Sequence, residues 1–108
     1  MRSVFFTFLL LVHCGGVHAE PLTQDQQQQA WRLFKALGCR ACHDFDKSGS
    51  TLAGSLDRIG LKLNEAEILQ RLQMPSQKIP LGKEFMPSYR TTPPEQLGLL
   101  SRFLAARK

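Results

Sequence analysis

The sequence has few residues of the types that bind metals, and it has no long apolar run. Its 108 residues include three cysteines, three histidines and three methionines, with one tryptophan and one tyrosine. The longest apolar stretch, residues 4–12, is far shorter than the ~20 residues that a membrane-spanning helix needs. No segment alternates apolar and polar residues as a half-buried strand does. These absences count against a transmembrane span and against a fold built on a sheet.

The first residues have the pattern of a secretory signal peptide. Arg2 precedes the apolar run, and Val17-His18-Ala19 follows it with the small or modest side chains that a signal peptidase accepts. We therefore expect residues 1–19 to be removed and residues 20–108 to form one exported domain, located in the periplasm. We do not expect lipidation at Cys14, because His13 stands where a small residue is required.

The charge of the chain is mildly basic, with a formal net charge of +5. This balance favours protein partners with acidic docking surfaces. No stripe of basic residues with interleaved aromatics is present, so we expect no nucleic-acid partner. Lys47, Lys83 and Arg90 are candidates for the basic surface that would meet such a partner, although ordinary solubility charges would have the same pattern.

Two segments have clear helix start signals, and the fold class that we expect is all-α. Thr23 followed by Gln26 fits a capping box, and the apolar residues after it recur at helical spacing up to Leu37. A second helix is predicted from Asn64 as N-cap to Met74, because Pro75 follows. Residues 44–60 are rich in turn formers and are expected to be irregular.

A third helix is predicted near the C-terminus, after a proline-rich connection over residues 75–94. Thr92 is the expected cap, with Glu95 completing a capping box, and prolines fill the first helical positions. The domain would then consist of three or more helices and ordered loops around one cofactor.

The cofactor is suggested by the segment GCRACH at residues 38–43. Once the leader is removed, Cys39, Cys42 and His43 are the only cysteines and histidine left. Three such donors cannot close a tetrahedral zinc site within one chain. A thioredoxin-like dithiol needs βαβ surroundings that the chain lacks. A disulfide across two residues would close a very small loop and stabilise little.

Covalent haem attachment uses every residue of this motif. Cys39 and Cys42 would form thioether bonds to the porphyrin, and His43 would be the proximal iron ligand. A second histidine is excluded as distal ligand, because none remains. We favour Met86, which lies in a stiff proline-rich loop, and keep Met74 and an open position as alternatives. Histidine–methionine ligation favours electron transfer over catalysis, because it leaves no position open for a substrate.

Three stretches of the chain resemble small bacterial class I cytochromes c. LFKALGCRACHDFD is similar to their N-terminal helix and haem motif, FMPSY to their methionine loop, and TTPPEQLGLLSRFLAARK to their C-terminal helix. The resemblance implies a small cytochrome c fold with one covalent haem c. It also implies a single-electron shuttle that is not an enzyme and that works between redox proteins. Trp31 or Phe34 should then cross the last helix near Leu100 or Phe103.

The chain departs from the family pattern after the haem motif. Ser50 stands where relatives have the proline whose carbonyl accepts a hydrogen bond from the proximal histidine. Serine also has a carbonyl that can accept this hydrogen bond, but its geometry is less constrained, and the departure bears on the reduction potential rather than on the function. Arg58 and Lys62 are candidates for contact with a haem propionate, or are simply solvated charges.

The alternative function is a haem-bearing subunit of a periplasmic oxidoreductase complex, or a gas-binding haem sensor with a weak distal ligand. A small disulfide-bearing interaction domain without haem is a third interpretation.

Overall fold

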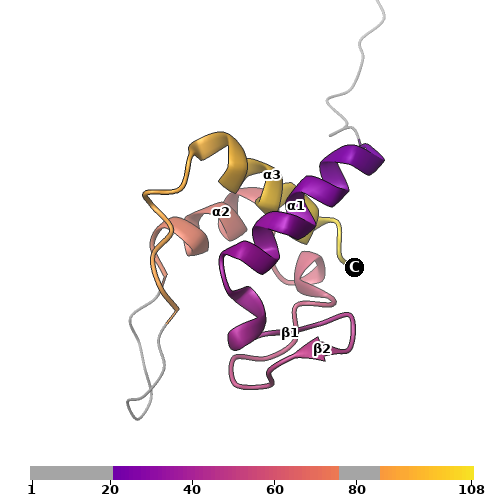
Figure 1. Ribbon diagram of the computed structural model, residues 1–108, viewed down its shortest axis with the longest axis vertical. Coiled ribbons are helices and arrows are strands. Elements are labelled where there is room, and N and C mark those ends of the chain that lie inside the picture. Colours follow the sequence, from indigo (N-terminus) through magenta and orange to yellow (C-terminus); the bar gives the residue numbers. More distant parts are fainter. Residues whose placement is uncertain (1–20, 76–85) are drawn as a thin grey trace, which may run out of the picture.

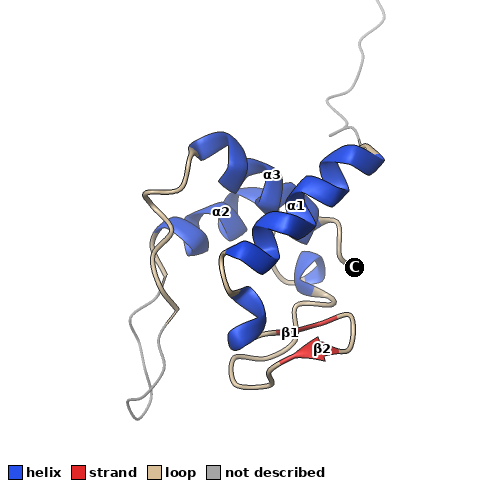
Figure 2. Cartoon of the chain, in the orientation of Figure 1, coloured by secondary structure: helices blue, strands red, loops and turns tan. Residues whose placement is uncertain are grey.

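The computed structural model describes residues 21–75 and 86–108. The predicted leader, Cys14 and Lys83 lie outside these ranges. Three α-helices, two short 3₁₀ helices and two short strands follow one another within them: α1 (Gln24–Ala36), η1 (Cys39–Ala41), β1 (Asp44–Phe45), β2 (Ser48–Gly49), η2 (Ile59–Leu61), α2 (Glu65–Gln73) and α3 (Pro94–Ala105). Figures 1 and 2 show the helices gathered on one side of the small sheet.

Helix α1 begins at the predicted capping box. The Thr23 hydroxyl accepts a hydrogen bond from the backbone N–H of Gln26 at 3.1 Å, and the Gln26 side chain accepts one from the backbone N–H of Thr23 at 3.0 Å. The helix ends at its C-cap Leu37, after which Gly38 adopts a left-handed conformation with φ of 76°. This turn leads the chain directly into η1, so the prediction that the first helix runs into the cysteine motif is confirmed.

Helix α2 also follows the prediction. The Asn64 side chain accepts from the backbone N–H of Glu67 at 2.9 Å, and the Glu67 carboxylate accepts from the backbone N–H of Asn64 at 3.1 Å. Met74 is the C-cap and has left the helical conformation. Pro75 comes next, and a residue before proline is disfavoured in the helical region.

The predicted start of α3 is wrong by one residue. Pro93, not Thr92, is the N-cap, and no side chain caps this helix. Pro94 explains the shift, because a proline forces the residue before it into the extended conformation that an N-cap requires. The Pro93 carbonyl accepts hydrogen bonds from the N–H groups of Gln96 and Leu97.

The all-α expectation is correct for the helices but misses a small sheet. Strands β1 and β2 pair antiparallel with Asp44 opposite Gly49 and Phe45 opposite Ser48. The two residues between them, Asp46 and Lys47, have φ values of 47° and 63°. Two successive positive φ values are those of the tight turn that matches the twist of a hairpin. Over residues 21–75 and 86–108 the chain is therefore mostly helical, with three α-helices, two short 3₁₀ helices and this sheet.

The core lies where α3 contacts both α1 and α2. The Phe45 ring connects this helical core to the sheet, at 4.8 Å from the ring centroid of Phe34 and 5.8 Å from that of Phe103. Phe34, Leu100 and Phe103 belong to one buried cluster, which agrees with the predicted crossing of the first and last helices. Burial of each such side chain stabilises the fold by roughly 1.5–3 kcal/mol.

No helix in the two described ranges is both long and apolar enough to serve as a membrane span.

Candidate functional site

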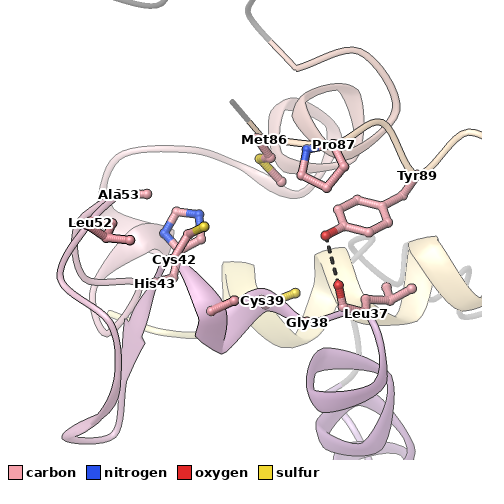
Figure 3. Close-up of a pocket in the computed structure, with 11 residues that line it drawn as sticks. Leu37, Gly38, Cys39, Cys42, His43, Leu52, Ala53, Met86, Pro87 and Tyr89 are labelled. Atoms are coloured by element: carbon pink, nitrogen blue, oxygen red, sulfur yellow. Dashed lines mark hydrogen bonds between the residues drawn. The ribbon is translucent and has the colours of Figure 1, made fainter. Parts of the chain in front are cut away.

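The cysteine motif is a tight turn that brings its reactive side chains to one cavity. Backbone N–H groups of Ala41 and His43 donate to the carbonyls of Gly38 and Cys39, at 3.0 and 2.9 Å. The turn places Cys39, Cys42 and His43 along the wall of a cavity of about 220 Å³. Figure 3 shows these three side chains on one side of the cavity. The Cys-x-x-Cys-His spacing therefore places all three side chains on the wall of the same cavity.

A second cavity, of about 160 Å³, adjoins the first and is lined by residues of the helical core. The two cavities share Cys39, His43 and Met86. The second is otherwise lined mainly by apolar side chains of the core and of the loop before α2: Phe34, Leu56, Ile59, Leu63, Ile68, Leu72 and Leu104. Arg71 of α2 is the charged exception on that wall. We call the two adjoining cavities together the apolar slot. The residues that line both of them are Cys39, His43 and Met86.

Both thiols of the motif are free. Cys39 is buried, and desolvation by burial raises the pKa of its thiol from 9.0 to about 11, although a backbone hydrogen bond acts in the opposite direction. The Cys39 thiol is therefore protonated at neutral pH. Redox-active dithiols have the opposite property, a thiol pKa lowered below its ordinary value. This electrostatic environment does not favour the dithiol interpretation.

His43 is oriented by a backbone carbonyl. Its Nδ1 lies 3.0 Å from the carbonyl oxygen of Gly54. A carbonyl can only accept, so Nδ1 carries the hydrogen, and in the neutral ring Nε2 keeps its lone pair. The acceptor is Gly54 and not Ser50, so the hydrogen bond that relatives make to their proline carbonyl does not survive at Ser50. The Ser50 N–H instead donates to the Arg40 carbonyl at 3.1 Å, which holds Ser50 in the loop beside the motif.

The β1–β2 hairpin supports the back of the motif. A Cβ atom on Gly49 would lie 2.3 Å from the His43 carbonyl oxygen and 3.2 Å from that of Arg40. The Arg40 guanidinium also donates to the Ser48 hydroxyl. This close approach requires glycine at residue 49, and it joins the hairpin to the residues between and after the cysteines.

Met86 approaches the cavity from the side opposite the cysteine motif, next to Pro87 (Figure 3). It begins the methionine segment, residues 86–89, which ends at Tyr89. The Tyr89 hydroxyl donates to the Leu37 carbonyl at 2.9 Å, and its ring lines the first cavity. Burial raises the pKa of this phenol, with smaller contributions from the charges of Cys39 and Cys42. Tyr89 was not predicted as a site residue.

The other candidates from the sequence lie away from the cavities. Met74 is 67% exposed and lines neither of them. Lys47, Arg58, Lys62 and Arg90 are exposed and also line neither cavity. The structure therefore brings Cys39, Cys42, His43 and Met86 together at one cavity. The four charged candidates stay at the surface. Within residues 21–75 and 86–108, no three His, Cys, Asp or Glu side chains form a group that could hold a metal ion by themselves.

Comparisons with protein-family models, with curated proteins and with solved structures find no match for this chain.

Proposed function

We propose that this chain is an exported c-type cytochrome, which carries one covalently bound haem c and transfers single electrons between redox proteins. One observation carries the proposal: two free thiols, an imidazole and a thioether from distant parts of the chain line one apolar slot. This donor set fits a covalently attached haem, because two cysteines spaced by two residues and followed by a histidine form the attachment pattern. We propose no enzymatic activity for the chain.

Each residue has a distinct role in this proposal. Cys39 and Cys42 would hold the porphyrin by thioether bonds, His43 would be the proximal iron ligand, and Met86 would be the distal ligand. When bound, the haem supplies a one-electron couple of its iron. The protonation of the Cys39 thiol at neutral pH does not count against haem attachment. The thioether bond would replace the thiol, and no titratable group would remain at Cys39.

Groups of the chain itself would raise the reduction potential of the bound haem. The Gly54 carbonyl fixes the His43 tautomer and leaves Nε2 as the donor atom. A thioether from Met86 is a soft ligand that favours the reduced iron, and the apolar lining excludes water and acts in the same direction. With His43 and Met86 both bound to the iron, no position would remain open for a substrate, so the site would suit electron transfer rather than substrate binding.

The partner and the cell compartment are further parts of the proposal. The basic net charge of +5 favours redox partners with acidic surfaces. The N-terminal pattern favours the periplasm, which is also where this type of haem is attached.

The visible spectrum of the purified protein tests the proposal. The full chain is produced in bacteria that export it and attach haem, and the reduced protein is measured before and after addition of carbon monoxide. A low-spin c-type spectrum that the gas does not change is the expected result. A spectral shift with the gas would mean an open distal position and would support the sensor or the enzyme-subunit interpretation. A colourless protein would overturn the proposal and leave the interaction-domain interpretation.

Variants of the cysteine motif complete this test. The double variant Cys39→Ser, Cys42→Ser is expected to lose covalent haem. Ser101→Ala, on α3, serves as a control because Ser101 lines neither cavity.

A further inference from the structure

Among the described residues, three hydrogen bonds join the methionine segment to parts of the chain that are distant in sequence. The Ser88 hydroxyl donates to the Gln73 carbonyl at 2.7 Å, and the Tyr89 backbone N–H donates to the Leu72 carbonyl at 2.9 Å. Both acceptors belong to the end of α2, on the same side of the slot as the segment itself. The third bond, from the Tyr89 hydroxyl to the Leu37 carbonyl, is different because it crosses to the other side.

Leu37 belongs to the cysteine side of the slot. It is the C-cap of α1, and only Gly38 separates it from Cys39. Its carbonyl is one of those that a helix end leaves without an intrahelical donor. The Tyr89 hydroxyl thus connects the segment that presents Met86 to the turn that presents Cys39, Cys42 and His43. Figure 3 shows this bond at the edge of the cavity.

We propose that Tyr89 is a positioning residue for Met86: its bond to Leu37 holds the thioether against the haem iron and keeps external ligands out. This inference rests on the proposed haem site. Tyr89 itself does not bind the iron. Without its hydroxyl, the two ties to α2 remain, but the methionine segment is no longer held to the cysteine side. The thioether should then spend more time released from the iron.

The size of the effect follows from the strength of one hydrogen bond. The net contribution of a typical intramolecular hydrogen bond changes an equilibrium by a factor of about 2 to 10. An external ligand such as imidazole binds only the form in which Met86 is released. Its apparent affinity is therefore proportional to the population of that form. Loss of the Tyr89 hydroxyl should tighten imidazole binding by the same factor of about 2 to 10.

The experiment is a titration of the ferric, haem-loaded protein with imidazole, in the wild type and in Tyr89→Phe. The matched control is Ser101→Ala. Ser101 is fully buried on α3, and its hydroxyl donates to the Leu97 carbonyl at 2.8 Å, so this variant also removes one hydroxyl–carbonyl bond. Ser101 lines neither cavity. We expect tighter imidazole binding in Tyr89→Phe and wild-type binding in Ser101→Ala.

A double-mutant cycle distinguishes positioning from a general structural role. In a Met86→Ala background there is no thioether to release, so Tyr89→Phe should leave imidazole affinity unchanged. Equal affinity in wild type and Tyr89→Phe would overturn the inference, and so would the same tightening with and without Met86. If Tyr89→Phe does not accumulate, Tyr89→Leu also removes the hydroxyl, and it should tighten imidazole binding only when Met86 is present.

The outcomes separate this inference from the proposed function. A wild-type protein without haem overturns both. A wild-type protein with haem, whose imidazole affinity does not depend on the Tyr89 hydroxyl, overturns the inference alone.

Discussion

Gly49 is the position where one added methyl group should disturb the cysteine motif most. Its φ is +109°, which side chains rarely tolerate, and the added Cβ would lie 2.3 Å from the His43 carbonyl oxygen. That oxygen belongs to the backbone, so no side-chain rotation can relieve the contact. In Gly49→Ala the hairpin must therefore move away from the turn that carries Cys39, Cys42 and His43.

The magnitude follows from two contributions. A positive φ costs an alanine about 1–2 kcal/mol. Movement of the hairpin also breaks the hydrogen bond from the Ser50 N–H to the Arg40 carbonyl, 3.1 Å long, with a net loss of about 0.5–1.5 kcal/mol. Loss of neighbouring packing adds to both, so we expect a decrease of about 2–4 kcal/mol in the free energy of unfolding.

Gly38→Ala provides the matched comparison. Gly38 also has a positive φ, +76°, but nothing lies within 4 Å of its Cβ position. The free energy of unfolding of Gly38→Ala should therefore fall only by what a positive φ costs an alanine, about 1–2 kcal/mol. The assay is denaturant unfolding of both haem-loaded variants. A Gly49→Ala protein as stable as Gly38→Ala would refute the close packing of the hairpin on the motif.

Three further outcomes are expected. Met86→Leu should keep its covalent haem but bind carbon monoxide in the reduced state, whereas Met74→Leu, at a side chain 67% exposed, should behave as wild type; the reverse pattern would reassign the distal ligand. In haem-free protein at neutral pH, Cys39 should be alkylated about 100-fold more slowly in the folded than in the unfolded chain, since burial raises the pKa of this thiol from 9.0 to about 11 and lowers its thiolate fraction by that factor; equal rates by mass spectrometry would contradict its burial. Because folding raises the pKa of this thiol, the haem-free fold should keep its full stability below pH 9 and lose part of it between pH 9 and about 11, and thermal unfolding of Cys39→Ser should lack that decline.

Local signals in the sequence predict the first two helices well. The Thr23 and Asn64 capping boxes involve residues three positions apart, so their geometry is encoded within a single turn. The start of α3 was misplaced because Thr92 has the right side chain for a cap. The backbone restriction from Pro94 outweighs that preference and makes Pro93 the cap.

The small sheet could not be predicted from periodicity, since each strand has two residues and no alternation to detect. The hydrogen-bond acceptor of His43 could not be predicted for the same reason, because it too depends on how the chain folds and not on a local pattern. The carbonyl of Gly54 reaches Nδ1 only because of the path that the chain takes after the hairpin. That path depends on the close approach of Gly49 to the motif, which is a tertiary contact.

The residues of the candidate site likewise fall into two groups: those that a local motif predicts and those that only the folded chain brings to the cavity. Cys39, Cys42 and His43 are adjacent in the sequence, and their chemistry is readable from spacing alone. Met86 was favoured for its place in a proline-rich loop, and the structure brings it to the slot. Tyr89 was missed because its hydroxyl bonds to a carbonyl 52 positions away. Two signals were available in the sequence: Tyr89 is the only tyrosine of the chain, and it ends the FMPSY segment that resembles a methionine loop.

The intact mass of the exported protein under denaturing conditions tests the central claim most directly. The full chain is produced in bacteria able to attach haem, and the purified product is unfolded before measurement. The account predicts the mass of a chain that begins at Glu20 plus one haem, with neither Cys39 nor Cys42 reactive toward a thiol reagent. The mass of the polypeptide alone, with both thiols titratable, would contradict it.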